Sequence, residues 1–376
     1  MLMMNVESEL HMTAGGGKTS YARNSRIQEK AMVEMKPVLE KVTREVYTAL
    51  LPRKMVVVDL GCSSGPNTLR FVSEVISIIA RRCRLVAQQQ NNAELQFFLN
   101  DLPANDFNNL FRYFEQFKKL MTRNHKGKAL PPFYISGSPG SFYTRLFPSQ
   151  TVHLFHSLFC LQWRSQAPKG LERAKKTLVD EGDIYITATS SPSIVKLFQK
   201  QFQNDFSIFL KLRHEELVLG GQMVLTFVGR KIEDAHSGEP NHFYGLLGQS
   251  LRSLVDKGLV EKEKLESFYI PIYSPSVREV EDVVKQNESF NINHIQLFEL
   301  NWDPYDDSES DVHDSVQSGT NVANCLRAVM ESVVASHFGD LIIDMLFTEY
   351  ARLVAKHLKK EKTKHAVIVL TMKKVC

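Results

Sequence analysis

Residues 55–67 read MVVVDLGCSSGPN, and this stretch decides the fold. Its apolar run is typical of a buried strand, and Asp59 stands where that strand runs into a turn of small residues. The next segment, residues 68–83, repeats its apolar residues at helical spacing. A strand, a glycine-containing turn and a helix bring the backbone close to a ligand at the carboxyl end of the strand. We therefore expect a binding site at this turn.

Strand-like and helix-like segments alternate through the first two thirds of the chain. Apolar runs predict strands at residues 55–61, 94–101, 133–137, 152–157, 182–189, 221–229 and 365–373. Buried strands that alternate with helices indicate an α/β domain with a mostly parallel sheet. We expect a ligand-binding sheet domain with an N-terminal lid over residues 1–235. A mainly helical substrate-binding cap over 236–350 and a helix end with the last strand over 351–376 complete the predicted organisation.

The composition is that of an ordinary globular protein. Hydrophobic residues make up 43% of the 376 residues, charged residues make up 23%, and the net charge is +4. So small a charge gives no support for nucleic acid or a membrane as partner. The five cysteines have no CxxC spacing, so neither a disulfide framework nor a zinc site is indicated. We find neither a signal-peptide pattern nor an apolar run near the roughly 20 residues of a membrane helix, and expect a cytoplasmic protein.

The residues around the turn narrow the class of ligand. Gly61 and Gly65 are spaced unlike the dinucleotide fingerprint, and no lysine follows them as it does in a phosphate-binding P-loop. Asp59 and Asp101 instead end two successive strands, and carboxylates suit a ligand that offers hydroxyl groups or positive charge. S-adenosylmethionine offers both. From the turn alone, the alternative is an ordinary strand–turn–helix connection with Asp59 as a cap.

Seven motifs together resemble those of the plant SABATH methyltransferases, in the same order and over nearly the whole chain. They are HMTAGGGKTSYARNSRIQ (11–28), DLGCSSGPN (59–67), FLNDLPANDFN (98–108), GSFYTRLFP (140–148), HSLFCLQWRSQAP (156–168), IPIYSPSVREVE (270–281) and EKTKH (361–365). Within the family, the chain is most similar to the grass carboxyl methyltransferases of anthranilate, benzoate and salicylate. The resemblance implies a Rossmann-like, seven-stranded class I methyltransferase sheet with a helical cap. It also implies S-adenosylmethionine as methyl donor, S-adenosylhomocysteine as product, a small aromatic acid as substrate and a homodimer.

The same resemblance implies a set of cofactor-binding residues. They are Tyr21, Ser25, Asp59, Cys62, Asn67, Asp101, Leu102, Ser141 and Phe142. Asp59, Cys62 and Asn67 are expected around the methionine part of the cofactor, Asp101 and Leu102 at the ribose, and Ser141 and Phe142 at the adenine. A carboxylate can accept hydrogen bonds from both ribose hydroxyls, and an aromatic ring can stack on the adenine. For Cys62 we expect no thiol chemistry.

The substrate side is implied in the same way. Gln28 and Trp163 match the family's carboxylate tether, and their N–H groups can hold two carboxylate oxygens. The implied ring pocket contains Phe159, Gln162, Val228, Phe243, Tyr244, Tyr273, Leu326, Val329 and His365. Gln162, together with Tyr244, suits an amino or hydroxyl group ortho to the carboxylate. This favours anthranilate or salicylate over benzoate, with anthranilate as our first choice; the alternative is that Gln162 faces a water or a backbone group.

The chain also departs from the family pattern. Thr13 replaces a lysine found in many members, and His365 stands at an aromatic position, where we interpret it as a packing residue. Thr189, Glu266 and Tyr269 stand where some members carry oxygen ligands for magnesium, so we expect no metal.

The expected reaction is an SN2 methyl transfer that depends on alignment. A carboxylic acid with a pKa of about 4 is already ionised at neutral pH, so no general base is needed. Two alternatives stay open: an N-methyltransferase that acts on the ring nitrogens of xanthines, and a non-catalytic small-molecule binding protein with the same fold.

Overall fold

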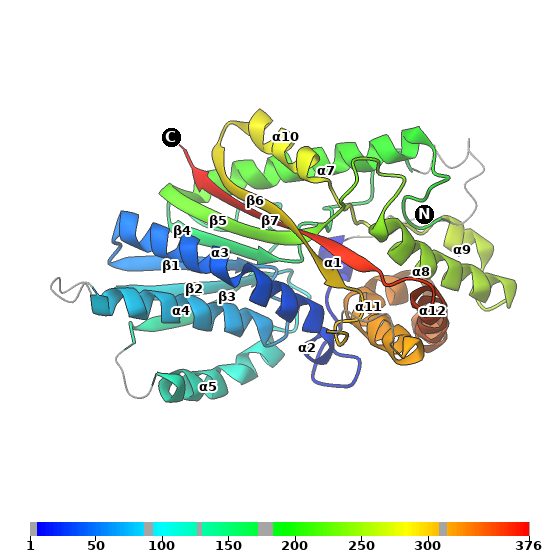
Figure 1. Ribbon diagram of the computed structural model, residues 1–376, viewed down its shortest axis with the longest axis horizontal. Coiled ribbons are helices and arrows are strands. Elements are labelled where there is room, and N and C mark those ends of the chain that lie inside the picture. Colours follow the sequence, from blue (N-terminus) through cyan, green and yellow to red (C-terminus); the bar gives the residue numbers. More distant parts are fainter. Residues whose placement is uncertain (1–5, 86–92, 126–129, 172–182, 308–313, 376) are drawn as a thin grey trace.

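A seven-stranded sheet runs through the molecule in the order β3-β2-β1-β4-β5-β7-β6 (Figure 1). This computed structural model describes residues 6–85, 93–125, 130–171, 183–307 and 314–375. The strands are β1 (Lys54–Leu60), β2 (Glu94–Asp101), β3 (Phe133–Pro139), β4 (Val152–Leu158), β5 (Leu217–Gly229), β6 (Phe290–Asn301) and β7 (Lys364–Lys374).

The first five strands of the chain are parallel to one another, and the last two are antiparallel additions. β1 pairs with β2 and β4, β2 pairs with β3, and β4 pairs with β5, all in parallel register. β7 lies between β5 and β6 and runs antiparallel to both. The carboxyl ends of the five parallel strands therefore meet at one edge of the sheet, where ligands bind in open α/β sheets.

Helices cover the sheet and extend it at one end. They are α1 (Val6–Glu9), α2 (Tyr21–Asn24), α3 (Arg26–Leu50), α4 (Asn67–Leu85), α5 (Phe107–Asn124), α7 (Pro192–Glu216), α8 (Glu239–Asp256), α9 (Lys262–Glu266), α10 (Val277–Asn287), α11 (Ser315–Phe338) and α12 (Ile343–Leu358), with a 3₁₀ turn η1 (Asp340–Ile342). α8, α9, α11 and α12 gather at the end of the molecule where β7 begins, at the right of Figure 1. These four helices form the cap.

Two of the expected elements differ from the structure. The strand predicted at 182–189 is wrong over residues 183–189, which form bends and turns; residue 182 lies outside the described residues. Ile184, Tyr185 and Ile186 are nonetheless buried, so their apolar pattern reflects packing against the cap and not a strand ladder. β6, within the segment expected to be mainly helical, was missed because its partly exposed residues alternate between apolar and polar beside strong helical patterns.

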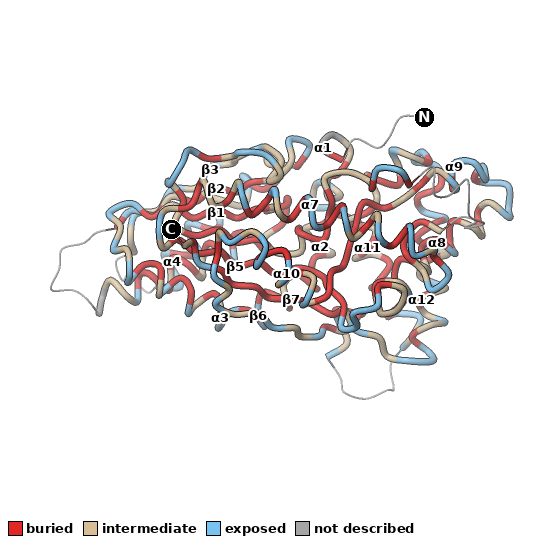
Figure 2. The backbone as a smooth tube through the Cα atoms, turned by 90° about the horizontal axis from the view of Figure 1, so that it is seen from above, coloured by how far each residue is buried: buried red, intermediate tan, exposed pale blue. Residues whose placement is uncertain are grey.

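The buried residues follow the sheet from end to end. Figure 2 shows buried backbone concentrated along the strands and along the inner sides of α3, α7 and α11. One apolar cluster joins β4, β5 and β7 to α7 and to the cap helices, and a second packs α3, α4 and α5 on β1 and β2. Because the first cluster is shared, the cap is fixed directly to the edge of the sheet where the parallel strands end.

Candidate active site

The carboxyl ends of the parallel strands open into a cavity of about 150 Å³. The turns that follow β1, β2 and β4 supply one side of it, and α8 and α11 supply the other. Val6, Leu10 and Met12 of the N-terminal segment line it, as does His365 at the start of β7. Residues from widely separated parts of the chain, from Val6 to His365, therefore line the cavity.

Asp101 lies in the cavity wall at the end of β2, beside the turn that follows β1. The backbone N–H of Ser63 donates to Asp101 Oδ2 at 2.7 Å, and the backbone N–H of Leu102 donates to Oδ1 at 2.8 Å. Burial raises the pKa of Asp101 to about 6, although both N–H groups favour its ionised form.

Gly61, at a φ of +74°, is required in the turn after β1, because a Cβ there would lie 2.1 Å from Cys160 Sγ.

Asp59 lies behind the cavity wall. Its Oδ1 accepts a hydrogen bond from His156 Nδ1 at 2.7 Å, and the His156 ring stacks on Phe71 with the ring centroids 4.0 Å apart. Asp59 and His156 are both buried and stand on the neighbouring strands β1 and β4. The bond therefore ties these strands together beneath the turn, and a contact of Asp59 with the cofactor stays a prediction.

Three further residues expected at the cofactor also lie behind the wall. Asn67 Nδ2 donates to the backbone oxygen of Ser25 at 3.0 Å and to Ser25 Oγ at 3.1 Å, which ties the junction of α2 and α3 to the start of α4. Cys62 Sγ points to the backbone oxygen of Ser63 at 3.4 Å. These contacts shape the turn, whereas Tyr21 does line the cavity.

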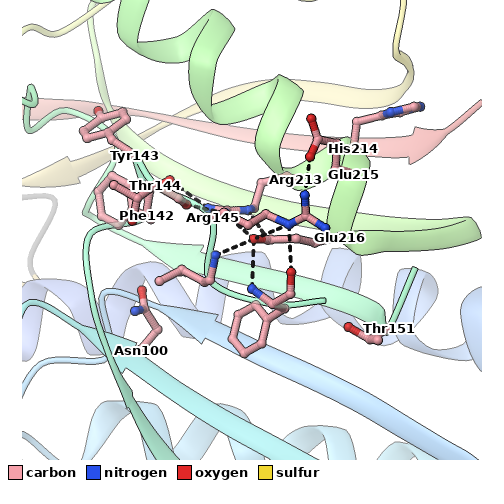
Figure 3. Close-up of polar contacts among 12 residues, drawn as sticks. Asn100, Phe142, Tyr143, Thr144, Arg145, Thr151, Arg213, His214, Glu215 and Glu216 are labelled. Atoms are coloured by element: carbon pink, nitrogen blue, oxygen red, sulfur yellow. Dashed lines mark hydrogen bonds and ion pairs between the residues drawn. The ribbon is translucent and has the colours of Figure 1, made fainter. Parts of the chain in front are cut away.

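Residues 141–151 form turns and bends between β3 and β4 and carry Ser141, Phe142 and Tyr143 into the cavity wall. Arg213, at the end of α7, donates to the backbone oxygens of Phe142 at 2.7 Å and Thr144 at 3.0 Å (Figure 3). Because this segment has neither a strand ladder nor a helix, the arginine side chain supplies hydrogen bonds to two of its backbone oxygens.

Glu216 completes this arrangement from the same helix. Its carboxylate pairs with Arg213 through Nε at 2.7 Å and Nη2 at 3.0 Å, and both side chains are fully buried. Glu216 Oε1 also accepts the backbone N–H groups of Leu146 at 2.6 Å and Phe147 at 3.0 Å (Figure 3). Backbone groups of this segment therefore occupy the hydrogen-bonding positions that the ion pair leaves free, and the ion pair fixes the segment in place.

Gln28, on α3, and Trp163, after β4, both line the cavity, as expected for a tether. Each is 7% exposed. The Tyr143 hydroxyl donates to the backbone oxygen of Trp163 at 2.6 Å and fixes the segment that carries the indole. Gln28 Oε1 finds no hydrogen-bond partner in the described part of the chain. This buried acceptor suits a donor group of a ligand, whereas a carboxylate would bond to the amide N–H of the same side chain.

Gln162 is held in one orientation. Its Nε2 donates to the backbone oxygen of Phe159 at 2.7 Å, and because a carbonyl can only accept, the amide nitrogen must face that oxygen. Gln162 Oε1 is buried and has no partner among the residues described. The side chain therefore presents an acceptor, and not a donor, as its unsatisfied group.

Most of the residues that we expected around the substrate ring line the cavity. From this set Phe159, Gln162, Val228, Phe243, Tyr244, Leu326, Val329 and His365 line it, as does Leu102 from the set expected at the cofactor. Tyr273 lies behind the wall, where its hydroxyl donates to Glu279 Oε1 at 2.7 Å. Sequence reasoning missed Trp302 and Cys325, because no local motif marks them and they reach the cavity only through the packing of the cap.

The N-terminal segment bridges the sheet and the cap over the cavity. The backbone N–H of Thr13 donates to the Ala328 oxygen of α11 at 2.9 Å, and that of Gly15 donates to Asp106 Oδ2, at the start of α5, at 3.1 Å. Thr13 Oγ1 also bonds to α11, at the Arg327 backbone oxygen at 3.4 Å. The segment therefore contacts both sides of the site.

The positions considered for metal ligands lie elsewhere. Thr189 lines a separate surface pocket with His236, and Tyr269 packs beside Phe198. Over the described ranges, three or more His, Cys, Asp or Glu side chains nowhere cluster in a way that would hold a metal ion. Each helix found in those ranges is also too short or too polar to cross a membrane.

Comparisons with known proteins agree with this geometry. Residues 7–375 match the family described as SAM dependent carboxyl methyltransferase. The chain is 67% identical over 376 residues to anthranilate O-methyltransferase 2 of Zea mays, with 99% of each chain covered. It is 51% identical to benzoate O-methyltransferase of Zea mays, with 99% of this chain and 100% of the relative covered. The solved structure of a loganic acid methyltransferase with SAH aligns at a TM-score of 0.82 and 31% identity over 97% of this chain and 99% of that one.

Replacement of Arg213 tests the role of the buried ion pair. Arg213→Met removes the closest positive charge from the buried Glu216 carboxylate and leaves Arg145 Nε, 3.6 Å from Oε1, as the remaining one, so we expect the free energy of unfolding to fall by about 3 kcal/mol. Arg81→Met is the control, because its 3.2 Å pair with Glu40 is exposed and should contribute no more than about 1 kcal/mol. Urea unfolding followed by circular dichroism measures both. Equal losses in the two variants would contradict the prediction.

Proposed function

Because the chain belongs to the family of SAM dependent carboxyl methyltransferases, we propose that it forms the methyl ester of a small aromatic acid, with anthranilate as the preferred substrate. The family and the class I fold predicted from the seven motifs are confirmed. The observation that carries the choice of acid is the unpaired Oε1 of Gln162 in the same cavity as Gln28 and Trp163. The homodimer, the cytoplasmic location and the absence of a metal requirement stay predictions.

The residues of one cavity side fit S-adenosylmethionine, which supplies the methyl group when bound. The Asp101 carboxylate uses one backbone N–H on each oxygen, so further lone pairs can accept from ribose hydroxyls. Phe142 and Ser141 would hold the adenine, on the segment fixed by Arg213 and Glu216. Asp59, Ser25, Cys62 and Asn67 would support this site from behind.

The other side of the cavity fits the acid. The amide N–H of Gln28 and the indole N–H of Trp163 would each donate to one carboxylate oxygen and hold it in line for transfer. The carboxylate is ionised at neutral pH, so its own lone pair suffices as nucleophile. The apolar walls, including Phe159, Val228 and Leu326, exclude water and fix the ring, and fixed geometry of this kind supplies roughly 7–11 kcal/mol of a barrier.

Gln162 supports anthranilate over its two competitors. The ortho-amino group of anthranilate has two hydrogens, so one can bond to the neighbouring carboxylate while the other reaches Gln162 Oε1. The hydroxyl of salicylate has one hydrogen and must choose between these acceptors, and benzoate offers none. The relative named for anthranilate also shares more of this sequence than the one named for benzoate. A xanthine substrate has no such observation in its favour. A non-catalytic role has a counterpart in a Zea mays relative named inactive anthranilate O-methyltransferase 1, which is 66% identical to this chain, and an assay for ester formation decides between the two.

An assay for ester formation tests the proposal. We expect the enzyme, S-adenosylmethionine and anthranilate to yield methyl anthranilate, identified by mass spectrometry. Trp163→Ala should lower kcat/KM for anthranilate by about 10–100-fold, because it removes a hydrogen bond to a charged group. The dissociation constant for S-adenosylhomocysteine, measured by calorimetry, should stay within about twofold. Loss of cofactor affinity equal to the loss of activity would contradict the tether, and N-methylated product would contradict the reaction.

Asp101 makes cofactor binding dependent on pH. Its pKa of about 6 in the free protein should fall when ribose hydroxyls donate to the carboxylate, because they favour the ionised form. Affinity for S-adenosylhomocysteine is therefore full above pH 6 and is lost below it, by at most about tenfold per pH unit. Asp101→Asn should bind weakly at every pH with a flat profile. Titration calorimetry from pH 5 to pH 8 measures this, and a wild-type profile as flat as that of the variant would refute it.

Selectivity between acids should depend on the Gln162 acceptor. Gln162→Met keeps the approximate length and volume and removes the acceptor, so kcat/KM for anthranilate should fall several-fold more than that for benzoate. Leu326→Met, in the apolar wall, should leave the ratio of the two constants unchanged. Steady-state kinetics with both acids at one cofactor concentration decide the matter. A ratio that stays constant in Gln162→Met would remove the physical basis for preferring anthranilate.

A further inference from the structure

Three aromatic side chains form one corner of the cavity, which we call the aromatic corner. Phe243 comes from α8, Trp302 follows β6 and His365 begins β7, and all three line the cavity. The Phe243 ring meets His365 edge-on at 4.8 Å and Trp302 edge-on at 5.0 Å between centroids. Trp302 and His365 lie 5.9 Å apart. The carboxylate tether and the Gln162 acceptor do not account for the polar atoms of this corner.

The Trp302 indole has an unmatched donor. Trp302 is 1% exposed, and its Nε1–H finds no acceptor among the described residues. The ring is held in place, because it stacks on His357 at 5.0 Å and its backbone N–H donates to the Thr363 oxygen at 3.1 Å. A buried donor without a partner is costly, so a site that retains one indicates a ligand acceptor.

His365 adds a second polar group to the corner. Within the described part of the chain its ring makes no hydrogen bond, and it packs on the rings of Phe243 and Trp302. Burial lowers the pKa of His365 to about 3, so the imidazole is neutral and has one donor and one acceptor nitrogen. The resemblance to the family implied an aromatic residue here, and imidazole fills such a position with a ring that also has hydrogen-bonding nitrogens.

The corner carries no charge. Burial raises the pKa of Cys325, which also lines the cavity, to about 12, so it is a neutral thiol. Among the described residues that line the cavity, those of the Asp, Glu, Lys or Arg type are Asp101 and Arg164. Asp101 stands at the end of β2, and Arg164 lies 4.0 Å from Asp205. A neutral hydroxyl suits the corner better than a carboxylate or an ammonium group, because it both accepts and donates.

We propose that the aromatic corner binds a ring hydroxyl of the acid substrate, which accepts from Trp302 Nε1–H and donates to the unprotonated nitrogen of His365. The preferred substrates then include aromatic acids with a hydroxyl beyond the ortho position, such as hydroxylated anthranilates. The inference rests on the proposed methyl ester formation and extends it to a substrate subclass. A site built to bond a polar group discriminates against analogues that lack it.

The test compares anthranilate with its ring-hydroxylated isomers, one at a time. We expect one isomer to have kcat/KM at least equal to that of anthranilate in the wild type. For that isomer, the ratio of its kcat/KM to that of anthranilate should fall about 5–10-fold in His365→Phe and in Trp302→Phe. His357→Phe is the matched control, because it keeps the stack on Trp302 from outside the cavity, and its ratio should stay at the wild-type value.

Gln162→Met separates this corner from the ortho-group site. It should lower the anthranilate-to-benzoate ratio and leave the ratio of hydroxylated to plain anthranilate unchanged. Thermal melts confirm that each variant is folded. If a variant is folded but inactive, dissociation constants for the acids with S-adenosylhomocysteine present supply the same ratios. Ratios that do not move in His365→Phe and Trp302→Phe, while anthranilate is still esterified, overturn the hydroxyl site alone. Absence of any ester in the wild type overturns the proposed function instead.

Discussion

The ion pair between Arg213 and Glu216 is the interaction on which the rest of the site depends. It is fully buried, where a charged pair costs desolvation energy unless every hydrogen-bonding position is used. The backbone of residues 142–147 uses those positions, so the segment and the pair stabilise each other. In this way a stretch without strand or helix becomes a rigid wall of a binding cavity.

Much of the fold could be predicted from the sequence because local patterns report local burial. The apolar run before Gly61 is a buried parallel strand, and the helix after the turn follows its apolar spacing. Residues 183–189 and β6 show where this reasoning fails. Ile184 and Ile186 are as apolar as any strand but are buried by the cap, whereas β6 is an edge strand whose half-exposed pattern resembles its helical surroundings. An apolar sequence pattern indicates that residues are buried, but it does not indicate which neighbouring element buries them.

The site residues also differ in whether their place could be predicted from the sequence. Asp101 could be placed at the cavity because any acid at the end of this strand reaches the ligand edge of the sheet. Asp59 has an equivalent local position, yet it pairs with His156, which stands 97 residues away in the chain. The orientation of Gln162 is likewise set by the backbone oxygen of Phe159 and cannot be read from residue types. The folded contacts of a side chain, whether 97 residues away as for Asp59 or three residues away as for Gln162, therefore decide which of its polar atoms stay free for a ligand.

The position of β7 links the site to the order of synthesis. This strand comes after all the others in the chain, yet it is inserted between β5 and β6 and provides the ladder partner of both (Figure 1). It also carries His365 into the cavity. While a ribosome is still translating residues 364–374, β5 lacks one neighbour, β6 has none, and the cavity lacks one wall. The nascent chain can assemble the parallel strands early, but the site is complete only once β7 has emerged and paired with β5 and β6.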